Sequence, residues 1–272
     1  MRALAAILAL WLLPLAGSAS PFLGPKPPAS PRRVVTLAPS LTEIVLDLGE
    51  GGRLVGVTRY DDAPEVRELP RVGGFVDPSP EAILRLEPDL LIVQPGPGNR
   101  EVVERLARLG VPVLVVPLNT LEEIFAGVEA VAEALGRGEK GRKLRAELRA
   151  RIEALRTRAA ALPRVRTLVV YGWQPLVVAG PGSYADELLR IAGGENVASG
   201  LRGAFPTIPA ERALRLPADR VIDTTMEDGA QVALPGWEGK VVPARSRALV
   251  RPGPRVIESL EELFQILHGE GP

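Results

Sequence analysis

Short apolar runs alternate along the chain with longer stretches in which apolar residues recur at helical spacing. Residues 33–38 are one such β-branched run, and residues 40–49 follow it with the spacing of a helix. Ser40 and Glu43 have the separation of a capping box, and Gly49 follows the last periodic residue. The pattern therefore predicts a strand and then a helix that begins at Ser40 and ends at Gly49.

The same alternation continues through the rest of the chain. The expected strands cover residues 53–57, 90–94, 111–117 and 167–172. The expected helices cover residues 80–87, 99–110, 121–135, 184–194 and 258–267. Strands that alternate with helices of this length are typical of parallel sheets whose two faces are covered by helices.

One phrase of the sequence occurs twice, at an offset of 130 residues. Residues 79–92 read SPEAILRLEPDLLI, and residues 209–222 read PAERALRLPADRVI. In the first copy, helical spacing places on the buried side Ile83, Leu84 and Leu86. The repetition predicts two lobes of similar structure.

A long charged stretch separates the two expected lobes. Residues 139–162 carry one apolar stripe, formed by Leu144, Leu148, Ile152 and Leu155. This stripe is too short to favour a coiled coil, whereas a helix rising about 1.5 Å per residue can span a small domain. We therefore expect an α/β protein with two Rossmann-like lobes, each with a parallel sheet, joined by a single long helix. The expected lobes are residues 33–120 and 164–272, with the connecting helices in residues 121–163.

The first residues have the three-part form of a secretory signal peptide. Arg2 precedes an apolar run over residues 3–15, and small residues occupy positions 16–19. The run is shorter than the ~20 residues of a membrane span, so we expect export and removal of residues 1–19. Because the chain has no cysteine, we expect a periplasmic protein that is neither a lipoprotein nor disulfide-bonded. Residues 20–32 are rich in proline and would form an extended, poorly ordered leader.

Composition argues against several functions. Lys+Arg and Asp+Glu both number 33, so the chain lacks the positive field that concentrates nucleic acid. His268 is the single histidine, which argues against a carrier of free transition metals. Asp61 and Asp62 are adjacent acids without an activated nucleophile or a metal set, and no GxSxG elbow occurs. We therefore expect no catalysis and no resident cofactor, and an exported two-lobed α/β hydrolase is the less favoured alternative.

Five phrases, in order along the chain, carry a resemblance to a known family. They are VVTLAPSLTEIVLDLG, LVGVTRYDDAP, VGGFVDPSPEAILRLEPDLLIV, LARLGVPVLVV and RPGPRVIESLEEL. Together they resemble the periplasmic substrate-binding proteins of ABC importers for cobalamin, iron siderophores and haem. The resemblance implies a ligand cleft between two α/β lobes, with little hinge closure. It also implies a binding protein, expected to be a monomer, that meets a permease dimer in the inner membrane.

The sequence segments LAPSLTE, GVTRYDDAP and AGGENV are most similar to those of the cobalamin-binding members. By that likeness Tyr60 corresponds to a cleft tyrosine, and Phe75 and Phe205 correspond to tryptophans that face the corrin. Large flat ligands are held mainly by apolar and aromatic faces. The alternative is that both phenylalanines are core residues, although neighbouring glycines favour exposed loops. Trp173, which follows the first strand of the second lobe, is a further cleft candidate.

Two departures from the cobalamin-binding pattern leave other ligands open. Pro95 stands where those proteins place another cleft tryptophan, and residues 244–251 replace an acidic and aromatic loop. Arg245 and Arg247 would suit an anionic ligand such as haem propionates or a ferric siderophore, or they are solvated surface charges. Tyr60 would serve as a phenolate ligand to haem iron, as in some relatives. Cobalamin is therefore the first expectation for the ligand, with haem or a ferric siderophore as alternatives.

Glu81 and Glu211 resemble the glutamates that project from the two lobes of these proteins and meet arginines of the permease. A repeated glutamate supplies one anchor on each lobe, as a two-fold permease pair requires. The alternative is that each glutamate stabilises the first turn of its own helix through the helix dipole. The resemblance favours docking.

Overall fold

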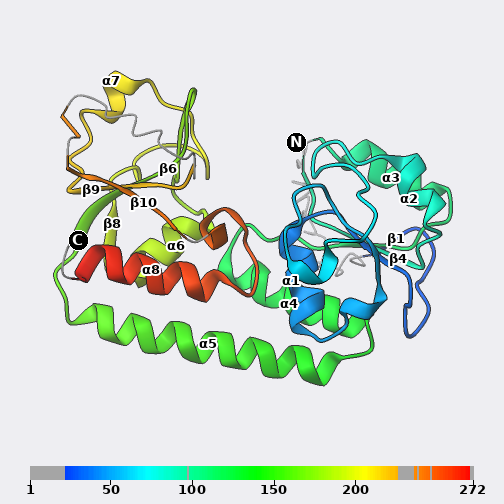
Figure 1. Cartoon of the computed structure of the whole chain (residues 1–272). Helices are drawn as coiled ribbons and strands as arrows, with labels where there is room; N and C mark the ends of the chain where they lie inside the picture. Colours follow the sequence, from blue (N-terminus) through cyan, green and yellow to red (C-terminus); the bar gives the residue numbers. More distant parts are fainter. Residues whose placement is uncertain (1–21, 97, 226–235, 238, 246, 270–272) are drawn as a thin grey trace, which may run out of the picture.

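The computed structural model of the chain describes residues 22–269, except for residues 97, 226–235, 238 and 246. Within these residues the chain forms two α/β lobes, and helix α5 runs beneath both of them (Figure 1). The expected two-lobed α/β fold is therefore confirmed. The expected signal peptide, residues 1–19, lies outside the described residues. In the part of the chain that is described, no helix has the length and apolar character needed to cross a membrane.

The first lobe is built around a five-stranded sheet with the strand order β1-β5-β4-β2-β3. Its strands are β1 (Phe22–Leu23), β2 (Val34–Thr36), β3 (Leu54–Gly56), β4 (Leu90–Val93) and β5 (Val113–Val115). Its helices are α1 (Pro39–Asp47), α2 (Pro80–Arg85) and α3 (Arg100–Arg108), with 3₁₀ turns at Gly51–Arg53 and Pro64–Val66. Strands β2 to β5 are parallel, and β2 and β4 are buried throughout, as expected for a sheet covered on both faces.

The second lobe has the strand order β10-β9-β6-β7, with β8 also paired to β6. Its strands are β6 (Val165–Trp173), β7 (Leu176–Val178), β8 (Gly194–Asn196), β9 (Arg220–Asp223) and β10 (Val241–Pro243). Its helices are α6 (Tyr184–Ile191), α7 (Ala210–Ala213) and α8 (Val256–His268), with a 3₁₀ turn at Arg247–Val250. Strand β7 is antiparallel to β6, which differs from the expected parallel sheet. A connection as short as the one between β6 and β7 can only reverse the chain direction.

The proline-rich leader is partly a strand, which differs from the expected poor order. Phe22 and Leu23 form an antiparallel ladder with Leu114 and Val113 of β5. Phe22 also packs against the main hydrophobic core. Without β1, the peptide groups on the edge of β5 would have no partner in the sheet. Pairing with this edge therefore orders the part of the leader that forms β1.

The N-cap of helix α1 lies two residues before Ser40, the N-cap that the capping pattern predicts. Ala38 is the N-cap and Pro39 is the first helical residue, a position that suits proline. Ser40 is buried inside the first turn, so the expected capping box with Glu43 does not form. Gly49, with φ of 68°, follows the end of the helix, which confirms the expected stop. Glu43 is therefore free to interact outside its own helix.

The repeated phrase forms α2 and β4 in the first lobe and α7 and β9 in the second. Gly73 and Gly203, which precede the two copies at the same offset, both have positive φ, of 105° and 90°. Residues with a Cβ rarely adopt this conformation, so both turns require glycine. The correspondence between the lobes therefore extends to the backbone of the loops that carry Phe75 and Phe205.

The buried side of α2 differs from the expected one at a single residue. Ile83 is fully buried and Leu86 is half-buried, but Leu84 is 36% exposed. Consecutive residues of a helix point about 100° apart, so the side chain that follows Ile83 is turned away from the core. Ser79 caps this helix by accepting a hydrogen bond from the Ala82 N–H at 3.2 Å.

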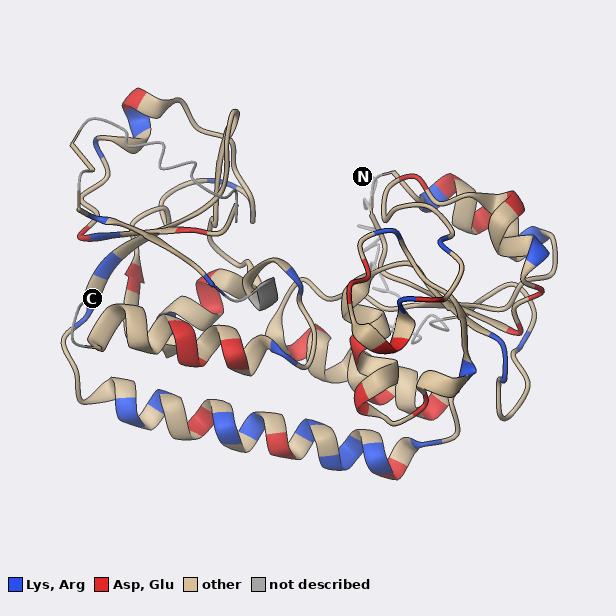
Figure 2. Cartoon of the chain, viewed as in Figure 1, with Lys and Arg blue, Asp and Glu red and all other residues tan. Residues whose placement is uncertain are grey.

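The lobes share one continuous core through the helices α4 (Leu121–Ala134) and α5 (Gly138–Ala160). Of the expected stripe on α5, three members are buried and Leu144 is half-buried. The hydrophobic cluster extends from α1 and β4 through α4 and α5 to α6 and α8. Gly141 allows α5 to approach α4 closely, because a Cβ at this position would collide with Ala132. On the outer face of α5, basic and acidic residues are interspersed (Figure 2).

Beside this core, hydrogen bonds and ion pairs between charged groups connect the two lobes. Arg251 of the second lobe donates two hydrogen bonds to Asp62 of the first, at 2.7 and 3.1 Å. Arg251 also lies 3.8 Å from Oε1 of Glu43, and Arg255 lies 4.0 Å from the same oxygen. The other oxygen of Glu43, Oε2, is buried and has no hydrogen-bond partner among the described residues. Burial raises the pKa of Glu43 to about 7, although Arg255 and Arg251 act in the opposite direction.

The raised pKa of Glu43 predicts a pH-dependent stability. The unfolded chain releases this proton near the ordinary pKa of 4.5, whereas the folded chain keeps it up to about pH 7. The folded state therefore binds more protons within this window, and its free energy of unfolding falls as the pH rises through it. We expect Glu43→Gln to abolish this fall, so that the melting temperature of the variant relative to the wild type increases from pH 4.5 to 7.

Calorimetric melting between pH 4 and 8 measures this difference. Glu65→Gln is the matched control, because Glu65 lies near Asp62 but is exposed. A melting-temperature difference for Glu43→Gln that stays constant over the whole range would contradict the assignment.

Candidate ligand-binding site

A cavity of about 350 Å³ lies between the two lobes. It is lined by Gln94, Leu118 and Asn119 on one side and by Tyr171, Val177, Tyr184, Phe205, Val250 and Pro252 on the other. Gln94 directly follows β4, and Asn119 lies between β5 and α4. In open parallel sheets, ligands bind beyond the carboxyl ends of the strands, which is where these two residues lie. None of the lining residues carries a formal charge, so the cavity suits an apolar or aromatic ligand face.

Phe205 and Tyr171 form an aromatic wall on the second lobe. Phe205 is 45% exposed, and its ring meets that of Tyr171 edge to face, with centroids 5.1 Å apart and planes at 85°. This geometry is favourable for aromatic pairs and holds one ring while leaving part of its surface open. Phe205, expected to face the ligand, therefore lines the cavity.

Two tyrosine hydroxyls stabilise the neighbouring segment that also lines the cavity. Tyr171 donates a hydrogen bond to the Leu249 carbonyl at 2.8 Å, and Tyr184 donates to the same carbonyl. Burial raises the pKa of both hydroxyls above their ordinary value, so they stay neutral donors. These bonds fix the segment that continues into Val250 and Pro252, which also line the cavity.

Asn99 holds the loop on the first lobe that faces this wall. Its side chain is almost completely buried, and it donates to the carbonyls of Phe75 at 3.1 Å and Gln94 at 2.9 Å. Its own carbonyl oxygen accepts from the Gly96 N–H at 3.0 Å. The half-buried Phe75 ring packs on Gly96, where a Cβ would come within 2.7 Å of the ring. Phe75 is thus held beside Gln94 but is not among the residues that line the cavity.

Tyr60 lies on the first lobe in a loop that is tied to the second. Its side chain is 50% exposed, with the Arg59 guanidinium 5.2 Å from the centre of its ring. Its backbone carbonyl accepts a hydrogen bond from Arg251 at 3.2 Å. Because Arg251 stands between Val250 and Pro252, this contact connects the Tyr60 loop to the edge of the cavity.

Of the other expected ligand residues, Trp173 and Arg245 are not among the residues that line the cavity. Trp173 is half-buried and packs against Trp237, a buried core residue of the second lobe, with ring centroids 6.1 Å apart. Arg245 is exposed, and its backbone N–H donates to Glu262. Arg247 begins a 3₁₀ turn, and its side chain lies outside the described part of the structure.

Glu81 and Glu211 occupy equivalent places on the two lobes. Each lies in the first turn of a short helix, α2 or α7, and each is exposed. Both helices lie on the parts of their lobes that face away from α5 (Figure 1). The two carboxylates are therefore accessible to a partner that contacts both lobes.

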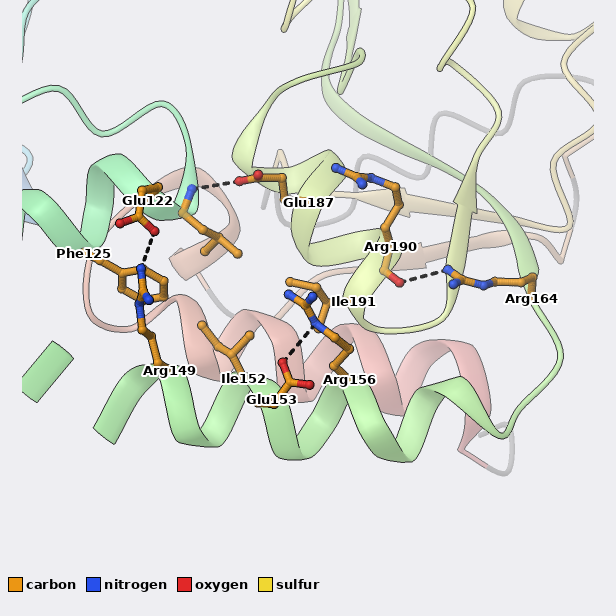
Figure 3. Close-up of a pocket in the computed structure, with 11 residues that line it drawn as sticks. Glu122, Phe125, Arg149, Ile152, Glu153, Arg156, Arg164, Glu187, Arg190 and Ile191 are labelled. Atoms are coloured by element: carbon orange, nitrogen blue, oxygen red, sulfur yellow. Dashed lines mark hydrogen bonds and ion pairs between the residues drawn. The ribbon is translucent and has the colours of Figure 1, made fainter. Parts of the chain in front are cut away.

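A larger groove of about 780 Å³ lies between α4, α5 and α6 (Figure 3). Its charged side chains are engaged with groups of the chain itself: Glu122 pairs with Arg149, and Glu153 lies 3.4 Å from Arg156. Glu187 accepts a hydrogen bond from the backbone of α4. Because these charged side chains already interact with other groups of the chain, the uncharged cavity between the lobes is the better ligand site.

The residues that the sequence reasoning missed are mostly supports. Tyr171 could have been found, because it lies near the end of a buried strand, where α/β proteins place ligand contacts. Asn99, Tyr184 and Arg251 act through hydrogen bonds to distant parts of the chain, for which the local pattern has no signal. In the described residues, no group of histidine or acidic side chains could hold a metal ion.

Comparisons with known proteins agree with this arrangement. Residues 34–243 match the family described as periplasmic binding protein. A vitamin B12-binding protein of Yersinia pseudotuberculosis serotype O:3 (strain YPIII) is 28% identical over 244 residues, which make up 88% of this chain and 87% of that protein.

Solved structures show the same similarity in three dimensions. The periplasmic vitamin B12-binding protein of Vibrio cholerae has a TM-score of 0.76 and 27% identity, covering 88% of this chain and 97% of that one. A periplasmic haem-binding protein of Pseudomonas aeruginosa has a TM-score of 0.78 and 27% identity, covering 89% and 94%. These are binding proteins rather than enzymes, in agreement with the expected absence of catalysis. The match over most of the chain, together with the two-lobed fold, shows that this protein belongs to the periplasmic binding protein family.

Proposed function

We propose that this protein captures a large metal chelate, cobalamin in the first place, between its lobes and delivers it to the permease of an ABC importer. The half-exposed Phe205, held by Tyr171 at the wall of an uncharged cavity, supports this proposal most directly. The similarity to vitamin B12-binding proteins of two organisms supports cobalamin as the first candidate.

The chemistry of the cavity suits a broad ligand with an apolar face. Covering the open part of the Phe205 ring removes apolar surface from water, which favours binding. Gln94 and Asn119 carry amide groups on the opposite side, which would orient polar substituents. Because the shared core fixes the distance between the lobes, little conformational order has to be created when the ligand binds.

We further propose that the protein acts in the periplasm as a freely diffusing monomer. The signal peptide expected in residues 1–19 would direct export, and the absence of cysteine leaves no site for a lipid anchor. The equal numbers of acidic and basic residues give no field for nucleic acid.

Haem and ferric siderophores are the second candidates for the ligand. Tyr60 exposes half of its side chain on a loop whose backbone is bonded to Arg251, and a phenolate is one of the groups that bind haem iron in proteins. The similarity to a haem-binding structure gives this alternative a basis. Arg245, exposed in the second lobe, would suit the carboxylates of such a ligand, as would Arg247. An exported hydrolase is not favoured, because the family match is to binding proteins.

Calorimetric titration of the mature protein with cyanocobalamin, haemin and a ferric siderophore tests the proposal. We expect cyanocobalamin to bind with a 1:1 ratio and Phe205→Ala to weaken its binding about tenfold, because one aromatic contact is lost. Leu109→Ala is the control, since Leu109 is 57% exposed and does not line the cavity. If haemin binds more tightly than cyanocobalamin and its complex shows a tyrosinate spectrum that Tyr60→Ala removes, the ligand is haem rather than cobalamin. Failure to bind any of the three ligands would reject the proposed function.

We also propose that Glu81 and Glu211 dock the protein on the permease. Replacing both with alanine should weaken permease binding about tenfold or more and reduce its sensitivity to salt, while ligand affinity stays unchanged. Glu101→Ala is the matched control, because Glu101 also lies in the first turn of a helix but has no counterpart in the repeat. A similar loss of ligand affinity in the double variant would count against a docking role.

A further inference from the structure

Two exposed leucines stand at the same position of the repeated phrase. Leu84 is 36% exposed on the first lobe, and Leu214 is 37% exposed on the second. Of the other large apolar side chains that are exposed in the described residues, Phe205 and Val250 line the cavity, whereas Leu109 and Leu162 lie elsewhere. A single exposed leucine needs no explanation, but equal exposure at equivalent places on both lobes does.

Each leucine lies beside the glutamate of its own lobe. Leu84 follows Glu81 by three positions in α2, and Leu214, which caps the C-terminus of α7, follows Glu211 by the same spacing. Residues three apart in a helix are neighbours on its surface. Each lobe therefore presents one carboxylate and one apolar side chain next to each other.

The leucines are not needed to attach these helices to the lobes. Ile83 and Ala213, which precede them, are fully buried and supply the inward contact of α2 and α7. These two buried residues differ between the copies, whereas the exposed glutamate, leucine and following arginine are identical. The inward contact of the two helices therefore tolerates a change of residue, whereas the outward glutamate, leucine and arginine are retained. Retention of these three exposed residues on both lobes points to a partner that contacts the same surface on each.

We propose that Leu84 and Leu214 are the apolar anchors of two equivalent docking patches, each completed by Glu81 or Glu211. The partner is the two-fold permease dimer, which would offer each lobe one apolar socket beside a basic group. Two equivalent patches on one chain match two identical subunits, and both patches lie on the side away from α5 (Figure 1). This inference rests on the proposed function, and it adds a contact that salt does not screen.

The two kinds of anchor differ in their response to salt. Attraction between a carboxylate and a basic group weakens as ionic strength rises, whereas burial of a leucine does not. Removing a leucine should therefore lower affinity at every salt concentration by the same factor. Removing a glutamate should lower affinity mainly at low salt.

The experiment measures binding of the mature, ligand-loaded protein to the source organism's importer permease in lipid nanodiscs, from 50 to 500 mM salt. We expect Leu84→Ala and Leu214→Ala each to weaken binding about tenfold, with the salt dependence of the wild type retained. Leu162→Ala is the matched control, because Leu162 is equally exposed, at 37%, but lies outside the repeat. Ligand affinity and melting temperature of the three variants should equal those of the wild type.

The possible outcomes separate this inference from the proposed function. If the wild type binds the permease and both leucine variants bind as tightly as Leu162→Ala, the leucine anchors are refuted while the delivery function stands. A loss in one leucine variant alone would refute the equivalence of the two patches. If the wild type does not bind the permease at all, both the inference and the proposed delivery fail.

Discussion

The hydrophobic cluster shared by the two lobes is the interaction on which the rest of the structure depends. Apolar residues of α1 and β4 pack through α4 and α5 onto α6 and α8, so separating the lobes would expose this surface to water. Gly141 permits the close approach of α5 and α4 that completes the cluster. Packing in this core therefore sets the distance between the cavity walls. Only modest movement of the lobes is compatible with keeping the core packed.

The walls of the cavity are loops, and loops need other means of support. Their peptide groups lie outside the sheets, so side chains must satisfy them. Asn99 does this on the first lobe, and Tyr171 and Tyr184 do it on the second by sharing the Leu249 carbonyl. Arg251 connects the two lobes at this point, because it follows the segment held by the tyrosines and donates a hydrogen bond to the carbonyl of Tyr60 on the first lobe. An exposed ring such as Phe205 can then keep one position without being buried.

The repeated phrase combines two kinds of constraint. Its inward residues serve each lobe separately: Ile92 is fully buried in β4, and Asp89 accepts hydrogen bonds from two backbone N–H groups at the start of the lobe. Its outward residues, Glu81 and Leu84, have no comparable role in folding, and their counterparts on the second lobe are identical. Duplication thus accounts both for two similar sheets and for two similar outer surfaces.

The sequence by itself determined the features that depend on local spacing. Alternating apolar runs indicated the two α/β lobes and the long helix, and the offset of 130 residues related Phe75 to Phe205 and Gly73 to Gly203. Only the tertiary structure decided which aromatic rings meet in the cavity, that Trp173 packs on Trp237, and that Glu43 faces arginines of the other lobe. Periodicity reports whether a side chain points inward, but its partner depends on how distant segments pack, and burial between two lobes has no local signature.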